Sequence, residues 1–312
     1  MNRSPASSRP TPPARLGEIR IGISGWTYKP WRGRFYPPKL PHHRELSYGA
    51  GIFNSIEING TFYSLQRPAS FQKWAAAVPD DFVFAVKGPR FITHLRRLND
   101  VRAPLANFFA SGLLRLGSKL GPVLWQLPPN FRFELKKIQS FFKLLPQDTE
   151  SAVALARRHD YRVSRRRWMR TDAHRRLRHC MEIRNPTFQV PEFIELLREY
   201  NVALVCADTV EWPLLMDVTA DFVYCRLHGS EVLYASGYDD SALDQWAERV
   251  VTWAQGREPS DAQRVCGLTS TTSNARDVFV YFDNDAKVRA PFDAQGLMAR
   301  VKAAIRTRRI CR

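Results

Sequence analysis

An arginine and a histidine stand two residues apart at the end of an apolar, strand-like run. The run covers residues 222–228, and Arg226 and His228 share one parity with Phe222 and Tyr224. Residues two apart in a β-strand point to the same face, so both polar side chains emerge together at the C-terminal end of the strand. A guanidinium suits an anion, and an imidazole beside it can move protons.

Seven other apolar runs carry polar or aromatic groups at the same place. Glu57 and Asn59 lie two apart on one face of their run, as do Glu182 and Arg184. The other runs end on, or are followed at once by, Trp26, Lys87, Gln126, Asp208 and Asn284. Charged side chains on the inner face of a strand need partners or a wet cavity, so the recurrence predicts a common site rather than packing.

The runs occupy residues 19–26, 52–59, 82–87, 122–127, 180–184, 203–208, 222–228 and 278–284. Most are separated by segments with helical spacing, at 68–77, 103–116, 133–145, 191–200, 239–254 and 297–305. Strands that alternate with helices predict a parallel sheet, and eight such units predict an α/β fold of the TIM-like (β/α)8 barrel type. A doubly wound open sheet is the alternative. Neither a GxGxxG fingerprint nor a P-loop follows the first strand.

A barrel of this kind carries its active site at the C-terminal ends of its strands. Mixed charges there suit a phosphate or another anion, with paired acids and bases moving protons. Carboxylates with a histidine also suit a divalent metal, but no HExxH motif supports one, so a metal is not favoured. A structural ion network is the remaining alternative. The catalytic candidates are Glu57, Glu182, Asp208 and His228, and the substrate-binding candidates are Trp26, Asn59, Tyr63, Lys87, Gln126, Arg184, Arg226 and Asn284.

The chain has 312 residues, of which we expect 1–17 to form a disordered, Pro-rich basic tail, 18–306 the barrel and 307–312 a basic tail. The segment 257–276 is rich in Ser and Thr and predicts a mobile surface loop. No apolar run is long enough for a membrane helix, and no signal peptide is recognisable. Five cysteines without a CxxC motif indicate buried free thiols and a cytoplasmic protein. The sequence does not indicate an oligomeric state.

The charge of the chain is strongly positive and unevenly placed. The net charge is +17, from 47 Lys and Arg against 30 Asp and Glu. Ten arginines fall within residues 157–178, which also contain apolar residues at intervals. Such a balance favours polyanionic partners, although a run of arginines is usually a solvated face. The candidates for nucleic-acid contact are Arg165, Arg166 and Arg167.

Ten segments of the chain together resemble the YecE-like family, a domain of unknown function (number 72) with a TIM-like barrel. They are IGISGW (21–26), FYP (35–37), SIEINGTFY (55–63), FAVKGPRFITH (84–94), GPVLWQLPP (121–129), EIRNPTF (182–188), ADT (207–209), FVYCRLHG (222–229), LYASGY (233–238) and YFDNDA (281–286). The resemblance implies the barrel and supplies no activity. Many members carry histidine where this chain has Asn185, which disfavours a metal further.

Two functions follow as expectations. The first is an enzyme or binder that acts on a phosphorylated or otherwise anionic small molecule at the barrel mouth. The second is a nucleic-acid-binding or DNA-repair-associated protein that uses the arginine-rich surface, in line with a fold-level similarity of the family to endonuclease IV. The steep salt dependence of phosphate contacts would separate the two.

Overall fold

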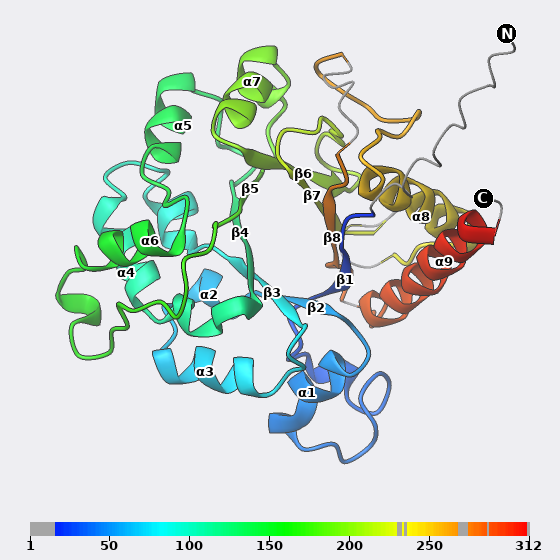
Figure 1. Cartoon of the computed structure of the whole chain (residues 1–312), viewed down its shortest axis with the longest axis horizontal. Coiled ribbons are helices and arrows are strands. Elements are labelled where there is room, and N and C mark those ends of the chain that lie inside the picture. The colour runs from blue at the N-terminus through cyan, green and yellow to red at the C-terminus, as the bar shows by residue number, and fades with distance from the viewer. Residues whose placement is uncertain (1–15, 230–232, 234–235, 268–273, 286, 311–312) are drawn as a thin grey trace, which may run out of the picture.

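The computed structural model describes residues 16–229, 233, 236–267, 274–285 and 287–310. Eight parallel strands close into a barrel in chain order, which confirms the fold predicted from the alternating pattern (Figure 1). The strands are β1 (Ile19–Ser24), β2 (Ser55–Ile58), β3 (Val83–Lys87), β4 (Leu120–Gln126), β5 (His179–Glu182), β6 (Val202–Asp208), β7 (Phe222–Leu227) and β8 (Asp277–Phe282).

The helices surround this ring of strands, and α8 and α9 lie side by side against β8 and β1 (Figure 1). Their bounds in the described chain are α1 (Glu45–Ala50), α2 (Gly60–Tyr63), α3 (Pro68–Ala76), α4 (Arg102–Ala110), α5 (Leu135–Phe142), α6 (Thr149–Ala156), α7 (Pro191–Glu199), α8 (Asp240–Ala254) and α9 (Ala290–Ile310). Short 3-10 or π turns are η1 (Lys29–Trp31), η2 (His42–Arg44), η3 (Phe91–Leu95), η4 (Leu113–Lys119), η5 (Tyr161–Val163) and η6 (Pro186–Phe188).

Two connections differ from a regular strand–helix alternation. The helix predicted over 103–116 ends at Ala110, because Gly112 has a φ of 113° and starts the tighter turn η4. A side chain at that position would also collide with Pro68. Residues 209–221, between β6 and β7, contain neither helix nor strand. Trp212 from this connection instead packs against the residues that fill the barrel.

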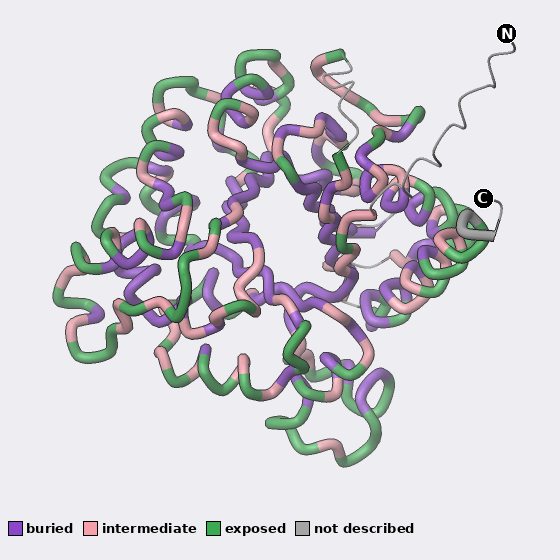
Figure 2. The backbone as a smooth tube through the Cα atoms, viewed as in Figure 1, coloured by how far each residue is buried: buried purple, intermediate pink, exposed green. Residues whose placement is uncertain are grey.

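The barrel has an apolar core on both faces of its strands. Side chains that alternate with the outward-facing ones fill the interior, and the outward-facing ones pack under the helices. Figure 2 shows the buried strands as the inner ring and the exposed residues on the outer turns of the helices. The interior set is Ala85, Leu124, Cys180, Ala203, Val205, Ala207, Trp212, Phe222, Tyr224, Phe279 and Tyr281.

Towards the C-terminal ends of the strands the interior changes from apolar to charged. The strand register places Ser24 of β1 level with Glu57 of β2, and Gln126 of β4 level with Glu182 of β5. On β7, Arg226 is the next inward-facing residue after the buried Tyr224. Because closure of the barrel brings these inward positions to one level, residues far apart in sequence meet in a single polar layer.

The ends of the described chain are attached to the barrel. Residues 1–15 of the expected disordered tail lie outside the described residues, whereas Gly17 donates its backbone N–H to Ala254 O. Helix α9 continues to Ile310, past residue 306, where we expected the barrel to end. The expected loop 257–276 is held in part by Asp217, which accepts hydrogen bonds from the backbone N–H groups of Val265 and Cys266. Residues 268–273 of this loop lie outside the described chain.

The cysteines in the described chain are all free thiols. Cys180, Cys206 and Cys225 are buried, as expected, and Cys266 is partly exposed. Cys311 lies outside the described residues. No helix among the described residues combines the length and the apolar character that a membrane crossing requires.

Candidate functional site

A pocket of about 640 Å³ opens at the C-terminal mouth of the barrel. Its walls come from the loops after β1, β2 and β8 and from the ends of β3, β4 and β5. Six of the residues predicted for substrate binding line it, namely Trp26, Asn59, Tyr63, Lys87, Gln126 and Arg184. The residues of this wall that sequence reasoning did not assign to the site are Gly25, Thr27, Tyr28, Ile58, Gly60, Phe62, Trp74, Asp283 and Asp285.

The loop after β1 forms the aromatic side of the pocket. Gly25 has a φ of 85°, a conformation that glycine adopts without strain, and it turns the chain out of β1. Its N–H donates to Glu57 O, which keeps the turn level with the end of β2. Trp26 then packs edge-on against Trp74 of α3 at 5.5 Å between ring centroids. The Tyr28 hydroxyl folds back and donates to Ser24 O at 2.6 Å, so the turn is fixed at both ends.

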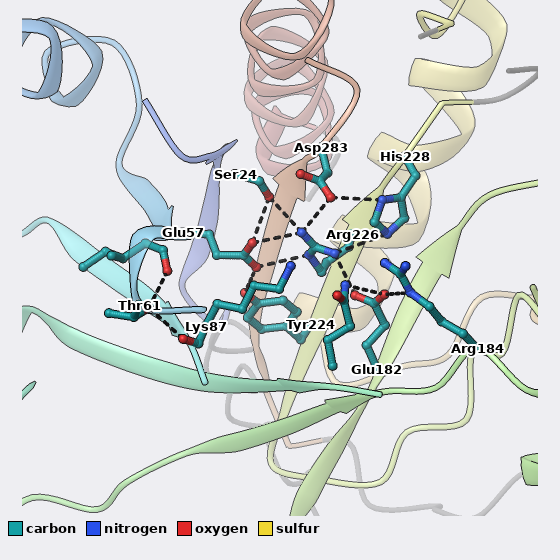
Figure 3. A network of polar contacts seen from close by, with 12 residues as sticks. Ser24, Glu57, Thr61, Lys87, Glu182, Arg184, Tyr224, Arg226, His228 and Asp283 are labelled. Carbon is teal, nitrogen blue, oxygen red and sulfur yellow. Dashed lines mark hydrogen bonds and ion pairs between the residues drawn. The ribbon is translucent and has the colours of Figure 1, made fainter. Parts of the chain in front are cut away.

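Arg226 sits at the centre of a charged network beneath the pocket (Figure 3). Its Nη1 donates to Glu182 Oε2 at 2.7 Å, and its Nη2 donates to Glu57 Oε1 at 3.0 Å and to Asp283 Oδ2 at 2.8 Å. Its Nε completes a second bond to Glu57 Oε2 at 3.2 Å. The side chain is fully buried. Each nitrogen of the guanidinium is therefore committed to a carboxylate.

The two glutamates are held from a second side as well. Glu57 accepts a bond from Tyr224 Oη at 2.6 Å and one from Ser24 Oγ at 3.0 Å. Glu182 accepts bonds from Gln126 Nε2 at 2.9 Å and Arg184 Nε at 2.8 Å. Both carboxylates have zero exposure, so they form the floor of the site rather than its lining.

The network keeps its charges at neutral pH. Burial alone would raise the pKa of Glu182, but Arg184 and Arg226 hold it well below its usual range. Burial likewise opposes ionisation of Asp283, and Arg226 keeps the pKa of that carboxyl below its usual value. Burial would lower the pKa of Arg226, but Asp283 and Glu57 hold it well above its ordinary value.

His228 follows β7 and lies in the same floor. Its Nδ1 is 3.2 Å from Asp283 Oδ2, and its Nε2 is 3.5 Å from Arg226 Nη1. The edge of the Trp212 ring covers it at 5.8 Å between centroids. The side chains of Arg226 and His228 therefore lie next to each other, but both point into the buried network and neither lines the pocket.

Lys87, the last residue of β3, reaches up beside this network. Its ammonium lies 4.4 Å from the centroid of the Phe62 ring, and the residue is 8% exposed. No carboxylate oxygen among the described residues lies within 4.0 Å of its Nζ. Figure 3 draws the side chain near Glu57 and Arg226 with no ion pair from its ammonium to Glu57. Burial, and then the positive charge of Arg226, lower the pKa of Lys87 from 10.5 to about 8.

Two further groups in the pocket lining are the carboxyl of Asp285 and the side-chain oxygen of Asn59. Burial and the neighbouring charge of Asp283 raise the pKa of Asp285 from 3.8 to about 6. Asn59 Oδ1 is buried and accepts no hydrogen bond from the described part of the chain. His94 lies at the edge of the same region, where burial and the charge of Lys87 lower its pKa to about 4.

Two further residues of the predicted site do not line the pocket. Asp208 is on the outward face of β6, where its carboxylate accepts from Trp246 Nε1 of α8 at 3.0 Å. Asn284 also has outward parity, and its Nδ2 donates to Asp293 Oδ2 at 2.7 Å and to Ser236 O. The structure does not bring these two side chains to the pocket, because the end of a strand alone does not decide the direction of a side chain. The inward residue at the end of β8 is Asp283, which the parity of Tyr281 would have identified.

The arginine-rich connection contributes no residue to the lining of the pocket of about 640 Å³, and it is partly anchored. Val163 is buried, and the backbone N–H of Trp168 donates to Ala110 O at 2.8 Å. Arg115 stacks on the Trp168 ring at 4.0 Å. These contacts leave exposed the arginines predicted for nucleic-acid contact, Arg165, Arg166 and Arg167.

The carboxylates of the floor are already bound to arginine side chains. Glu57 and Glu182 are both engaged by arginine, which competes with a cation for the same oxygens. Among the described residues, no group of three His, Cys, Asp or Glu side chains is arranged to hold a metal ion.

Comparisons with known proteins agree with the fold. A family model described as "Protein of unknown function DUF72" matches residues 20–310. The chain is 30% identical over 118 residues to the UPF0759 protein YunF of Bacillus subtilis, and 31% identical over 132 residues to the UPF0759 protein YecE of Escherichia coli K12. These matches span 36% and 41% of this chain, and about two fifths of each relative, at 41% and 44%.

Solved structures match over a larger part of the chain. A DUF72 family protein from Thermotoga maritima superposes with a TM-score of 0.68 at 23% identity, covering 91% of this chain and 99% of that one. A DUF72 family protein from Enterococcus faecalis superposes with a TM-score of 0.65 at 16% identity, covering 91% and 95%. At these identities the likeness concerns the fold. Together with the family match across almost the whole barrel, it establishes that this chain belongs to the DUF72 family.

Proposed function

We propose that the pocket at the barrel mouth binds a small phosphorylated or otherwise anionic molecule. The observation that carries the proposal is Lys87, a buried cation that faces the pocket and has no carboxylate within 4.0 Å among the described residues. A buried charge is costly unless it is paired, and an anionic ligand would supply the missing pair. Its arrival would also raise the lowered pKa of Lys87, so that binding and protonation favour each other.

Arg184 is the second cation that faces the ligand. Its Nε donates a hydrogen bond to Glu182, and its Cζ lies 4.1 Å from the centroid of the Trp212 ring. These two contacts fix the plane of the guanidinium. The side chain is 12% exposed and lines the pocket. A guanidinium held in this way presents its edge to a carboxylate or phosphate. Arg226, which the sequence suggested as a third ligand group, acts instead as a positioning residue for the floor.

The size and walls of the pocket suit a ligand larger than a free ion. A volume of about 640 Å³ lies within the range of small-molecule sites. Trp26, Tyr28 and Trp74 form an apolar wall, and Tyr63 stands 71% exposed at the rim. Aromatic faces of this kind stack on sugar or heterocyclic rings. We therefore favour a phosphorylated sugar or a similar ring-bearing anion.

Proton transfer in this site falls to Asp285 rather than to the glutamates. Glu57 and Glu182 are sealed and bonded to Arg226, whereas Asp285 faces the pocket with a pKa of about 6. A carboxyl that titrates near neutral pH serves as acid or base for a bound ligand. His228 lies in the floor and does not line the pocket, so it would act on a ligand through its neighbours and not by direct contact.

Binding of a charged sugar tests the proposal by thermal shift. Glucose 6-phosphate at about 100 times its dissociation constant should stabilise the protein by about 2.7 kcal/mol, a rise of several degrees in Tm, while neutral glucose should not. Lys87→Met should remove the shift. Asp208→Asn is the matched control, because that carboxylate lies outside the pocket, and it should retain the shift. Equal shifts in wild type and Lys87→Met across phosphates and carboxylates would contradict the proposal.

A second candidate, binding of a nucleic acid, is favoured by one surface feature. An apolar groove of about 200 Å³ next to the mouth is lined by Tyr63, Phe91 and Arg162, among others. Tyr63 and Phe91 are exposed, and the exposed Arg165–Arg167 run follows Arg162 closely in the chain. Exposed aromatic rings beside arginines suit stacked bases and phosphates of a single strand.

Replacement of Arg165, Arg166 and Arg167 by Gln tests this second candidate. The triple variant should bind single-stranded DNA more weakly, with a salt slope smaller by up to about 2, since each phosphate contact adds about 0.7 for a single strand. Its Tm should stay within about 2 °C, because exposed charges contribute little to stability. No binding by the wild type at low salt would end this candidate.

A further inference from the structure

Lys87 has surroundings that differ from those of an ordinary anion-binding lysine. Its ammonium rests against the face of Phe62, and the residue is almost fully buried and lines the pocket. The nearest cation in the floor, Arg226, repels the protonated amine, while Glu57, Glu182 and Asp283 are already engaged by Arg226. The ammonium group of Lys87 therefore loses its proton more easily than a lysine at the surface does.

These are the two conditions that make a lysine a nucleophile. Burial in an apolar pocket and a neighbouring cation each favour the neutral amine, and together they are the usual means by which proteins activate lysine for attack on a carbonyl group. With a pKa of about 8, roughly a tenth of the Lys87 side chains are neutral at pH 7 and about half at pH 8. A lysine needed only to attract an anion would gain nothing from this shift.

The pocket also contains the proton donor that such chemistry requires. Asp285 lines the same wall as Tyr28, and its carboxyl is partly protonated near neutral pH. Arg184 lines the same pocket, and its guanidinium can contact an anionic group of the substrate there. An amine, a carboxylic acid and a fixed cation thus line one pocket of suitable size.

We propose that Lys87 forms an imine with an aldehyde or ketone that also carries a phosphate or carboxylate group. The proposal rests on the proposed function and narrows its substrate class to carbonyl compounds. Arg184 would hold the anionic group, and the aromatic wall would exclude bulk water from the reacting carbon.

The step balances without a further reactant. The neutral Nζ attacks the carbonyl carbon, so that a C–N bond forms while the C=O π bond opens, and a proton passes from nitrogen to oxygen to give a carbinolamine. Asp285 then donates its proton to the hydroxyl group, which leaves as water as the nitrogen lone pair forms the C=N bond. The products are a protonated imine, one water molecule and the Asp285 carboxylate.

Reductive trapping tests the imine directly. The full-length protein is incubated with pyruvate, glyoxylate or glyceraldehyde 3-phosphate in the presence of sodium borohydride, and the adduct is located by intact mass and peptide mapping. We expect one reduced adduct per chain, on Lys87, with at least one of these probes. Lys119→Arg is the matched control, because that lysine is also partly buried but pairs with Asp80 away from the pocket, and it should leave trapping unchanged.

Two variants separate failure of this proposal from failure of the proposed function. Lys87→Arg keeps the positive charge, so it should keep a phosphate-induced thermal shift and lose the adduct, whereas Lys87→Met should lose both. Asp285→Asn should slow trapping at pH 7 by at least about tenfold, a modest share of the usual effect of a general acid.

The outcomes are distinct. An anion-induced shift in wild type with no adduct on Lys87, or adducts spread evenly over surface lysines, would overturn the imine and leave anion binding intact. Absence of any anion-induced shift would overturn the proposed function itself. An adduct that persists at the same site in Lys87→Arg would show that another residue is the nucleophile.

Discussion

Replacement of Arg226 by methionine is expected to lower the free energy of unfolding by about 3–5 kcal/mol, the usual cost of removing one partner from a buried ion pair. The variant would leave Glu57, Glu182 and Asp283 buried without their shared cation. In a barrel of this length such a loss lowers Tm by roughly 5–15 °C. Denaturant unfolding followed by fluorescence and circular dichroism measures it.

Controls distinguish this network from ordinary ion pairs. Arg300→Met removes an exposed pair with Asp240 and Asp244, so it should cost no more than about 1 kcal/mol. In the Arg226→Met background, Glu57→Gln should recover part of the lost stability because it removes one stranded charge. A loss below about 1 kcal/mol for Arg226→Met would show that the carboxylates find other partners.

Replacement of Lys87 by methionine is expected to have the opposite effect and to stabilise the protein at pH 7. A pKa lowered from 10.5 to about 8 corresponds to about 3 kcal/mol of destabilisation in the protonated state. Loss of the contact with Phe62 offsets about 1–2 kcal/mol of the gain. The net increase should therefore be about 1–3 kcal/mol, together with loss of the ligand-induced shift.

The pH dependence of the two proteins follows from the sign of this shift. The folded pKa of Lys87 lies below that of the unfolded chain, so the unfolded chain binds more protons between about pH 8 and 10.5. Wild-type stability should consequently rise relative to Lys87→Met across that window, by about 3 kcal/mol. Lys119→Met is the matched variant. Because the amine of Lys119 is paired with Asp80 in the wild type, this variant should instead be less stable than wild type at pH 7. A destabilised Lys87→Met protein with no such pH dependence would identify Lys87 as a structural residue.

The expected effects of the two variants have opposite signs. Arg226 is expected to stabilise the fold because it is paired with three carboxylates. Lys87 is expected to weaken the fold because no carboxylate lies within 4.0 Å of its Nζ among the described residues, and such a cost is typical of residues kept for binding or catalysis. The sequence placed both residues at strand ends and grouped them as ligand-binding cations.

Much of the fold was readable from the chain because eight apolar runs alternate with helical spacing. Strand parity also placed Glu57, Glu182 and Arg226 on one level, since parallel strands in a barrel bring their inward positions together. The same parity points Asp208 and Asn284 outward, away from the interior residues Ala207 and Tyr281. It points Asp283, two residues after Tyr281, inward to the network.

Other features of the site depend on three-dimensional closure. Nothing in the local sequence distinguishes Arg226, which is sealed by three carboxylates, from Arg184, which keeps a face in the pocket. Asp285 acquires its raised pKa from burial and from Asp283, and both depend on how the folded chain places the residues after β8. Loop positions of this kind are set by tertiary contacts, which periodicity does not record.

The most direct test of the central claim is a crystal structure of the wild-type protein with inorganic phosphate, compared with that of Lys87→Met grown under the same conditions. The account predicts a phosphate in the mouth with an oxygen within hydrogen-bonding distance of Lys87 Nζ and of the Arg184 guanidinium, and no phosphate there in the variant. A wild-type structure in which Lys87 pairs with a carboxylate of the floor, with phosphate bound only at the outer surface or not at all, would contradict it.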